Sequence, residues 1–292
     1  MLKYFTYEVY IPSIDQAVRF REITNSHYID ILKYIQNNDN TGLLQYIQFI
    51  ISQLCCESNI RFNRVDVFCI MSTIRMVCVG DVMELNIKSE DSPAITNKLS
   101  VHSIISKIAN EVDIVRDRNV QIRDNITVTI NLPYHLYYDI QEEFILDCIT
   151  GINVNGEFSD LRHATSDQRK EIFKNLTGDA LNCIISYLDD LHSKIDDIQI
   201  INSTSDDTEA VKVNIFDNSL FEVLKFLYRD NLLNVYEKQY VLGGKIGMGI
   251  DAYMSLSPAE IDLHLNTYAR EKKQQEKSNR ASSDIPTIGG GF

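Results

Sequence analysis

The most continuously apolar part of the chain lies between Val65 and Val79 and reads VDVFCIMSTIRMVCV. Because nearly every residue is apolar, the stretch shows neither the period of an amphipathic helix nor the alternation of a half-buried strand. Its length does not separate a buried helix from a buried strand either. We predict a helix in its first half and a strand from Ile74 into Val79.

Two other stretches alternate as strands do. Residues 82–87 alternate and are predicted to pair across a turn at Gly80-Asp81. Residues 126–132, which read ITVTINL, alternate strictly and end at Pro133, so they form the clearest strand of the sequence. Two segments are predicted to be loops from their composition: residues 88–100 and 151–159.

Apolar residues at helical spacing cover most of the remaining sequence. Thr24 is placed to cap a helix whose apolar stripe runs from Tyr28 to Ile35, and Thr165 with Gln168 forms a capping box. Further helices are predicted at 43–54, 177–195, 219–228 and 232–242. Another helix is predicted to begin at Pro258, with Ser257 as its cap. Two strands at 198–201 and 211–216 are predicted to form a hairpin. The fold class is therefore α+β, mostly α: N-terminal helices, a small antiparallel β element, and a helical C-terminal half with a short β-hairpin.

The composition along the chain predicts three parts. Residues 1–150 are expected to form an N-terminal α+β domain, and residues 151–270 a helical C-terminal domain with the hairpin. Residues 271–292 are charged and polar and end in Gly-Gly-Gly-Phe. Such a composition does not bury a core by itself, so this part is predicted to be a flexible tail.

The charge balance argues against several classes of partner. With 28 Lys and Arg against 41 Asp and Glu, the formal net charge is −13. Proteins that grip phosphates need a surplus of cations, so we expect no direct nucleic acid partner and no membrane partner. No stretch has the ~20 apolar residues of a membrane-spanning helix, and we see no secretory signal. The six cysteines have mostly apolar neighbours and are expected to be reduced.

No catalytic motif stands out, so the protein is predicted not to be an enzyme, with no cofactor, metal or small-molecule substrate. The segment 247–252, Gly-Met-Gly-Ile-Asp-Ala, formally matches the dinucleotide-binding pattern G-x-G-x-x-A. That pattern needs a preceding strand and a following helix, whereas residues 232–242 look helical. The glycines are better explained as a tight connection between helices. His163, in a polar loop, is the one histidine to inspect as an acid or base.

Tyrosine is abundant, with 15 residues and no Trp. Aromatic side chains are enriched at protein interfaces, although a core role is as common for each one singly. The candidate partner-binding residues are Tyr134, Tyr137, Tyr138, Tyr253 and the terminal Gly289, Gly290, Gly291 and Phe292.

The order of the predicted elements along the chain is similar to that of a known protein family. Four segments carry it: FREITNSHY (20–28), VTINLP (128–133), VNIFDNSLFEVLKF (213–226) and YMSLS (253–257). In this order the chain, over about residues 15–272, resembles the baseplate hub and hub-assembly proteins of T-even-type contractile-tailed bacteriophages. Some members carry a Cys-x-x-Cys knuckle in the central hairpin. Here the corresponding residues are Cys78-Val79-Gly80-Asp81, so no zinc site is carried over.

The resemblance implies a non-enzymatic structural or assembly protein of the central hub of the tail baseplate. It would bind other tail and baseplate hub proteins in the host cytoplasm during assembly, and the virion tail baseplate is the second location that the resemblance implies. Two alternatives stay open. One is an assembly chaperone absent from the mature particle. The other is a nucleotide-binding enzyme using the loop Gly243–Gly249, which falls if that loop simply joins two helices.

Overall fold

A single buried helix forms from the apolar stretch. In a computed structural model, residues 65–78 belong to α3 (Arg64–Cys78), so the strand predicted from Ile74 is wrong. The side chains of α3 are buried from residue 64 through residue 75. A helix surrounded on all sides needs no polar face, which is why the sequence shows no period there. The structure describes residues 5–87, 95–110, 118–134, 136, 141–161, 164–196, 199–201, 210–212 and 219–283.

The start of α3 is determined by a buried capping box. The Asn63 side chain accepts a hydrogen bond from the Asp66 backbone N–H at 3.0 Å, and Asp66 accepts one from the Asn63 N–H at 2.9 Å. Asp66 also accepts a hydrogen bond from the Ser13 N–H at 3.0 Å, which ties the N-terminal hairpin to the helix. These bonds satisfy backbone donors that the first turn leaves without helical partners.

An N-terminal hairpin that the sequence analysis did not predict packs on α3. It consists of the antiparallel strands β1 (Thr6–Ile11) and β2 (Gln16–Arg21). The helices α1 (Asn25–Gln36) and α2 (Asn40–Leu54) follow, and their apolar stripes face the same core. Thr24 caps α1 as predicted, and α2 begins at Asn40 with Asp39 as its cap.

The next hairpin pairs differently from the prediction. Strand β3 (Val82–Ile87) lies where the alternation predicted it, but its partner is β4 (Ile95–Ser100), and not residues before Gly80. Residues 95–100 were predicted as loop, and that is wrong; the rest of the predicted loop, 88–94, lies outside the described residues. The helix α4 (Val101–Asn110) follows and contacts α3.

A four-stranded antiparallel sheet forms the second part of the fold. Its order is β5 (Arg118–Arg123), β6 (Ile126–Ile130), β7 (Ile149–Val154) and β8 (Glu157–Asp160). The strand predicted around residue 128 is confirmed as β6. The loop predicted at 151–159 is wrong, because these residues form the β7–β8 hairpin. Three helices accompany the sheet: α5 (Gln141–Cys148), α6 (Ser166–Asn175) and α7 (Gly178–Asp196).

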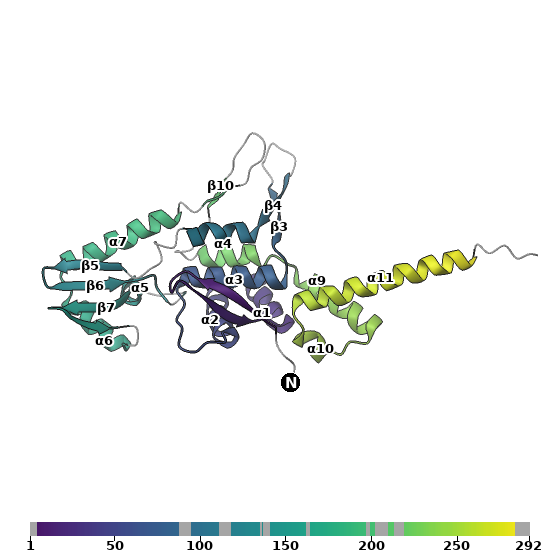
Figure 1. The fold of residues 1–292 in the computed structure, drawn as a ribbon, viewed down its shortest axis with the longest axis horizontal. Helices are drawn as coiled ribbons and strands as arrows, with labels where there is room; N and C mark the ends of the chain where they lie inside the picture. The colour runs from purple at the N-terminus through teal and green to yellow at the C-terminus, as the bar shows by residue number, and fades with distance from the viewer. Residues whose placement is uncertain are drawn as a thin grey trace, which may run out of the picture.

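The C-terminal helices return to the first core. They are α8 (Ser219–Leu227), α9 (Leu232–Val241), the π-helical turn η2 (Leu242–Ile246), α10 (Ile250–Ser255) and α11 (Pro258–Ser283). Ser257 and Glu260 close the capping box predicted for the last helix, with 2.8 Å from the Ser257 N–H to Glu260 Oε2. In Figure 1, α11 runs outward, away from the sheet of β5–β8 at the other end.

The buried side chains form two clusters. The larger one surrounds α3 and includes residues from Val9 to Leu136 and again from Leu220 to Ile261. The smaller one lies between the β5–β8 sheet and its helices, from Val128 to Ile184. The division at residues 150 and 270 stays a prediction from composition.

The predicted fold class is confirmed. The chain is α+β and mostly helical, and all strand pairs among the described residues are antiparallel. The short hairpin predicted in the C-terminal half is also present, as β9 (Gln199–Ile201) and β10 (Ala210–Lys212).

The buried carboxyl at the start of α3 makes stability depend on pH. Burial raises the pKa of Asp66 from 3.8 to about 6, against the lowering effect of its hydrogen bonds. Within that interval the folded state holds the proton more tightly than the unfolded state, so the free energy of unfolding should fall as pH rises. Across the interval, wild type should lose roughly 3 kcal/mol relative to Asp66→Asn. Urea unfolding of both proteins between about pH 4 and about pH 7 measures this; parallel pH profiles would contradict it.

Candidate functional site

The predicted partner-binding residues do not form one surface among the described residues. Tyr134 is half-buried at the junction of the two clusters, where its backbone N–H donates to Asp147 Oδ2 at 2.5 Å. Its ring lies 5.7 Å from the Arg61 guanidinium. Tyr253 lies in the larger core with 1% exposure, and its hydroxyl donates to the Val235 carbonyl at 2.6 Å. Tyr137, Tyr138, Gly289, Gly290, Gly291 and Phe292 lie outside the described residues, as does His163.

The glycine-rich loop does not have the structure of a dinucleotide site. Helix α9 precedes it and continues directly into η2, and Gly247 ends that turn in the left-handed region with φ 76°. Gly249 then stands at the N-cap of α10, which has only six residues. Because no strand leads into the loop, it joins two helical elements, and the nucleotide-binding alternative loses its structural basis.

Potential metal ligands do not gather in the part of the chain that the structure describes. No group of three or more His, Cys, Asp or Glu side chains is close enough there to hold an ion. The six cysteines are all free, and Cys69, Cys78 and Cys148 are buried. Burial raises the pKa of each of these three thiols, so they behave as small apolar core residues.

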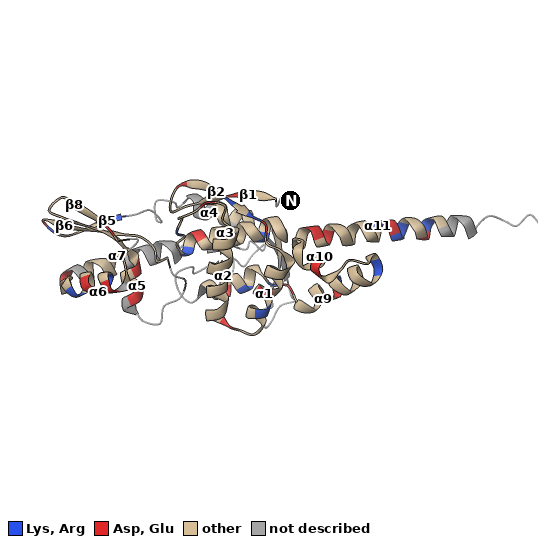
Figure 2. Ribbon diagram, turned by 90° about the horizontal axis from the view of Figure 1, so that it is seen from below, with Lys and Arg blue, Asp and Glu red and all other residues tan. Residues whose placement is uncertain are grey.

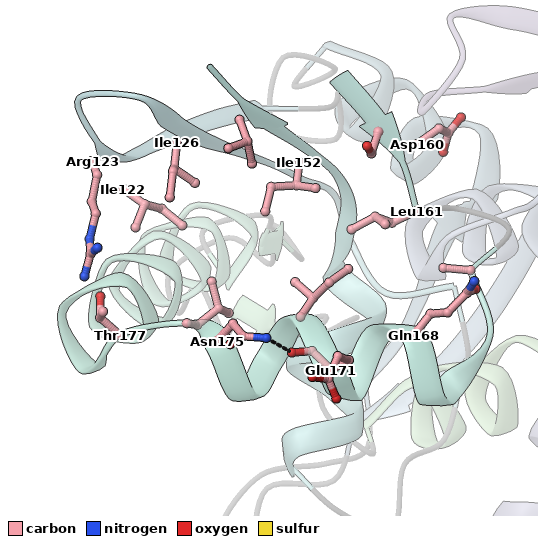
Figure 3. Close-up of a pocket in the computed structure, with 15 residues that line it drawn as sticks. Ile122, Arg123, Ile126, Ile152, Asp160, Leu161, Gln168, Glu171, Asn175 and Thr177 are labelled. Carbon is pink, nitrogen blue, oxygen red and sulfur yellow. Dashed lines mark hydrogen bonds between the residues drawn. The ribbon is translucent and has the colours of Figure 1, made fainter. Parts of the chain in front are cut away.

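An apolar groove opens between the β5–β8 sheet and α6, with a volume of about 750 Å³. On the sheet side, Ile122, Ile126 and Ile152 point toward the helix, as Figure 3 shows. On the helix side, Ile172 and Leu176 complete the wall. These five side chains are half-buried, so the groove offers apolar surface that remains in contact with water. Such a surface binds apolar side chains of a ligand.

Polar residues line the edges of the groove. Asp160 at the end of β8 and Glu171 on α6 place a carboxylate on each edge, and Arg123 lies at one end of the groove (Figure 3). Asn175 donates to the Glu171 carbonyl at 2.8 Å, which holds its amide along the helix. The groove therefore combines an apolar interior with a mainly acidic edge.

Local sequence explains how each wall forms. Thr165 accepts a hydrogen bond from the Gln168 N–H, and Gln168 accepts one from the Thr165 N–H at 2.9 Å, so α6 starts beside the groove. On the sheet side, Asn155 and Gly156 have φ values of 55° and 90°, as a tight hairpin turn with two left-handed residues requires. Composition alone predicts the turn and its strands as one loop, so this wall was not expected from the sequence. The Asn-Gly pair between alternating residues was the signal that could have identified it.

An ion pair between α5 and α6 lies where the groove unit meets the chain segment around Tyr134. Arg169 on α6 lies 3.0 Å from Asp147 Oδ1, and the two side chains are 11% and 4% exposed. The other Asp147 oxygen accepts the Tyr134 N–H. Nearby, Arg64 at the start of α3 donates to the Leu136 carbonyl at 2.9 Å. Asp147 therefore anchors α6 and the chain segment that leads back to α3.

Comparison with known proteins assigns the class. Residues 4–221 match the family model described as T4 bacteriophage base plate protein, so the class is that of phage baseplate proteins. Because the match covers most of the chain, the protein belongs to this family. No curated protein and no solved structure matches it. Membership indicates a structural or assembly protein of the tail baseplate, rather than an enzyme, with other baseplate proteins as partners. None of the described helices is both long and apolar enough to cross a bilayer.

The Asp147 junction should contribute strongly to stability. Replacing Asp147 by Ala leaves the buried Arg169 charge without this carboxylate and removes the acceptor of the Tyr134 N–H. We expect the free energy of unfolding to fall by roughly 3 kcal/mol. Glu222→Ala is the control, because its contact with Lys225 is exposed and should contribute less than about 1 kcal/mol. Chemical denaturation measures the free energy of unfolding of both variants. If Asp147→Ala lowered it no more than Glu222→Ala does, the role of the junction would be contradicted.

Proposed function

We propose that this baseplate protein is a structural or assembly protein of the central hub, and that it acts by binding other hub proteins. Family membership supports the baseplate, and the order of elements, which resembles hub and hub-assembly proteins, supports the hub. Assembly would take place in the host cytoplasm. No nucleic acid, membrane, cofactor or small-molecule substrate is part of this function.

One observation carries the proposal of protein binding. Along α9, the side chains of Leu233, Tyr236 and Tyr240 are 60%, 43% and 79% exposed. Their spacing places them on one face of the helix, which we call the α9 stripe. The opposite face carries Val235, which is buried, and Lys238, which lies 2.8 Å from Asp262 on α11. The stripe is therefore not needed to hold α9 in place.

The chain that follows α9 also carries exposed apolar residues. Ile246 at the end of η2 and Ile250 at the start of α10 are 42% and 57% exposed. Tyrosine and large aliphatic residues gathered on a surface mark protein interfaces more often than scattered apolar residues do. The glycine loop thus belongs to a region whose side chains are suited to a protein partner.

The alternative of an assembly chaperone uses the same fold and the same stripe. It differs from a hub component only in whether the protein remains in the finished particle. Mass spectrometry of purified virions and of infected-cell lysate separates the two. Detection in virions makes the protein a hub component, whereas detection only in lysate, bound to hub intermediates, makes it an assembly factor. Absence of hub proteins among its partners in both samples would contradict the hub role.

The α9 stripe can be tested by affinity capture from infected cells. The double variant Leu233→Ser/Tyr240→Ser should recover at least about tenfold less of the baseplate proteins bound by wild type, because anchor residues of an interface each contribute over 1 kcal/mol. Phe5→Ser/Val82→Ser is a matched control, since these side chains are 71% and 53% exposed outside α9. Equal recovery by both variants would show that the stripe is not the binding surface.

A further inference from the structure

The groove and the last helix lie at opposite ends of the molecule. In both Figure 1 and Figure 2, the β5–β8 sheet with α6 occupies one end, and α11 extends from the other end along the long axis. The end of α11 therefore lies far from the groove of the same copy.

The outer part of α11 has no core of its own. All side chains from Ala269 through Ser278 are exposed. We call residues 270–280 the basic arm, because it contains five cations against two anions, which leaves −16 for the rest of a chain of net charge −13. Figure 2 shows this outer part of α11 apart from the other helices. The end of a helix that packs on nothing gains no stability from burial, so contact with a partner would stabilise it.

The sequence after the arm changes from basic to apolar. Residues 284–292 read DIPTIGGGF and contain three large apolar residues, Ile285, Ile288 and Phe292. The C-terminal segment thus presents cations first and apolar side chains second.

The groove has the complementary character. Its walls are mainly isoleucine and leucine, and its edges carry the carboxylates of Asp160 and Glu171, with the cation of Arg123 at one end. The surrounding unit, residues 118–196, has thirteen acidic against seven basic residues, or a net charge of −6. The basic arm and the groove unit therefore have opposite charges, and both the groove and the segment after the arm have apolar residues.

We propose that residues 270–292 of one copy bind the groove of a second copy. The apolar residues after the arm occupy the groove between the sheet and α6, while cations of the arm lie beside the acidic edges. Because the donor segment and the acceptor groove are on opposite ends, the contact is head-to-tail. Such a contact continues from copy to copy and closes into a ring or extends as a filament. This inference does not depend on the hub role.

Sedimentation of the purified full chain tests the proposal. Wild type should associate beyond the monomer as its concentration rises, and should dissociate when NaCl is raised from about 50 mM to about 500 mM, because the exposed charges are then screened. A chain that ends at Ser283 keeps α11 but lacks the apolar residues, and it should associate at least about tenfold more weakly, since burial of large side chains is lost.

Charge reversal tests which surfaces meet. Glu171→Lys on the groove edge and Lys277→Glu/Arg280→Glu on the arm should each weaken self-association, and combining both sets in one chain should restore it in part. Glu237→Lys on α9 is the matched control, because this exposed glutamate lies outside both surfaces and should leave association unchanged. If the separate variants weakened self-association only by disturbing the fold, combining them would not restore self-association.

Several results would overturn the proposal. A wild-type chain that stays monomeric throughout the concentration range would do so, and so would association unaffected by truncation and by Glu171→Lys. Arm-dependent binding of a short DNA duplex by a monomeric protein would assign the basic arm to nucleic acid instead. Virion mass spectrometry is independent of all these outcomes, so failure of the hub role and failure of self-association are distinguishable.

Discussion

The fold depends on one helix that is buried from its first turn. Helix α3 can occupy the centre only because the Asn63–Asp66 capping box satisfies backbone donors that would otherwise be buried without partners. The same start holds the N-terminal hairpin through Ser13 and the chain segment at Leu136 through Arg64. At the other end, Arg75 donates to the Leu227 carbonyl at 2.9 Å and fixes α8. Polar side chains at the ends of an apolar helix thus organise the elements around it.

The connection between the two cores follows from this arrangement. The segment after β6 passes the start of α3, where Asn63 donates to Asn131 at 3.4 Å, and then meets the Asp147–Arg169 pair of the smaller unit. Each of these contacts is buried, so each constrains how the unit sits against the larger core. The β5–β8 sheet and α6, which form the walls of the groove, lie at the end of the molecule opposite α11 (Figure 1).

The exposed features of the structure are distributed over different parts of the molecule. The α9 stripe, the basic arm and the groove lie on different elements and differ in chemistry. The stripe is largely aromatic, the arm is cationic, and the groove is apolar with carboxylates at its edges. If the proposed surfaces bind proteins, their different chemistry favours a different partner for each, because the side chains that complement one surface do not complement another. The α9 stripe lies on a helix that packs on the larger core, whereas the groove is built on the smaller cluster.

Local sequence by itself determined the helices whose caps and stripes are complete, such as α1 with Thr24 and α6 with Thr165, and the strictly alternating strand β6. These elements carry their signal within a few residues, since capping and amphipathic burial act over one or two turns. Only the tertiary structure decided that residues 74–78 are helical, that β3 pairs with β4, and that the β7–β8 hairpin forms a wall of the groove. Burial on all sides removes the period that distinguishes helix from strand, and strand partners are chosen by packing between segments that local sequence does not bring together.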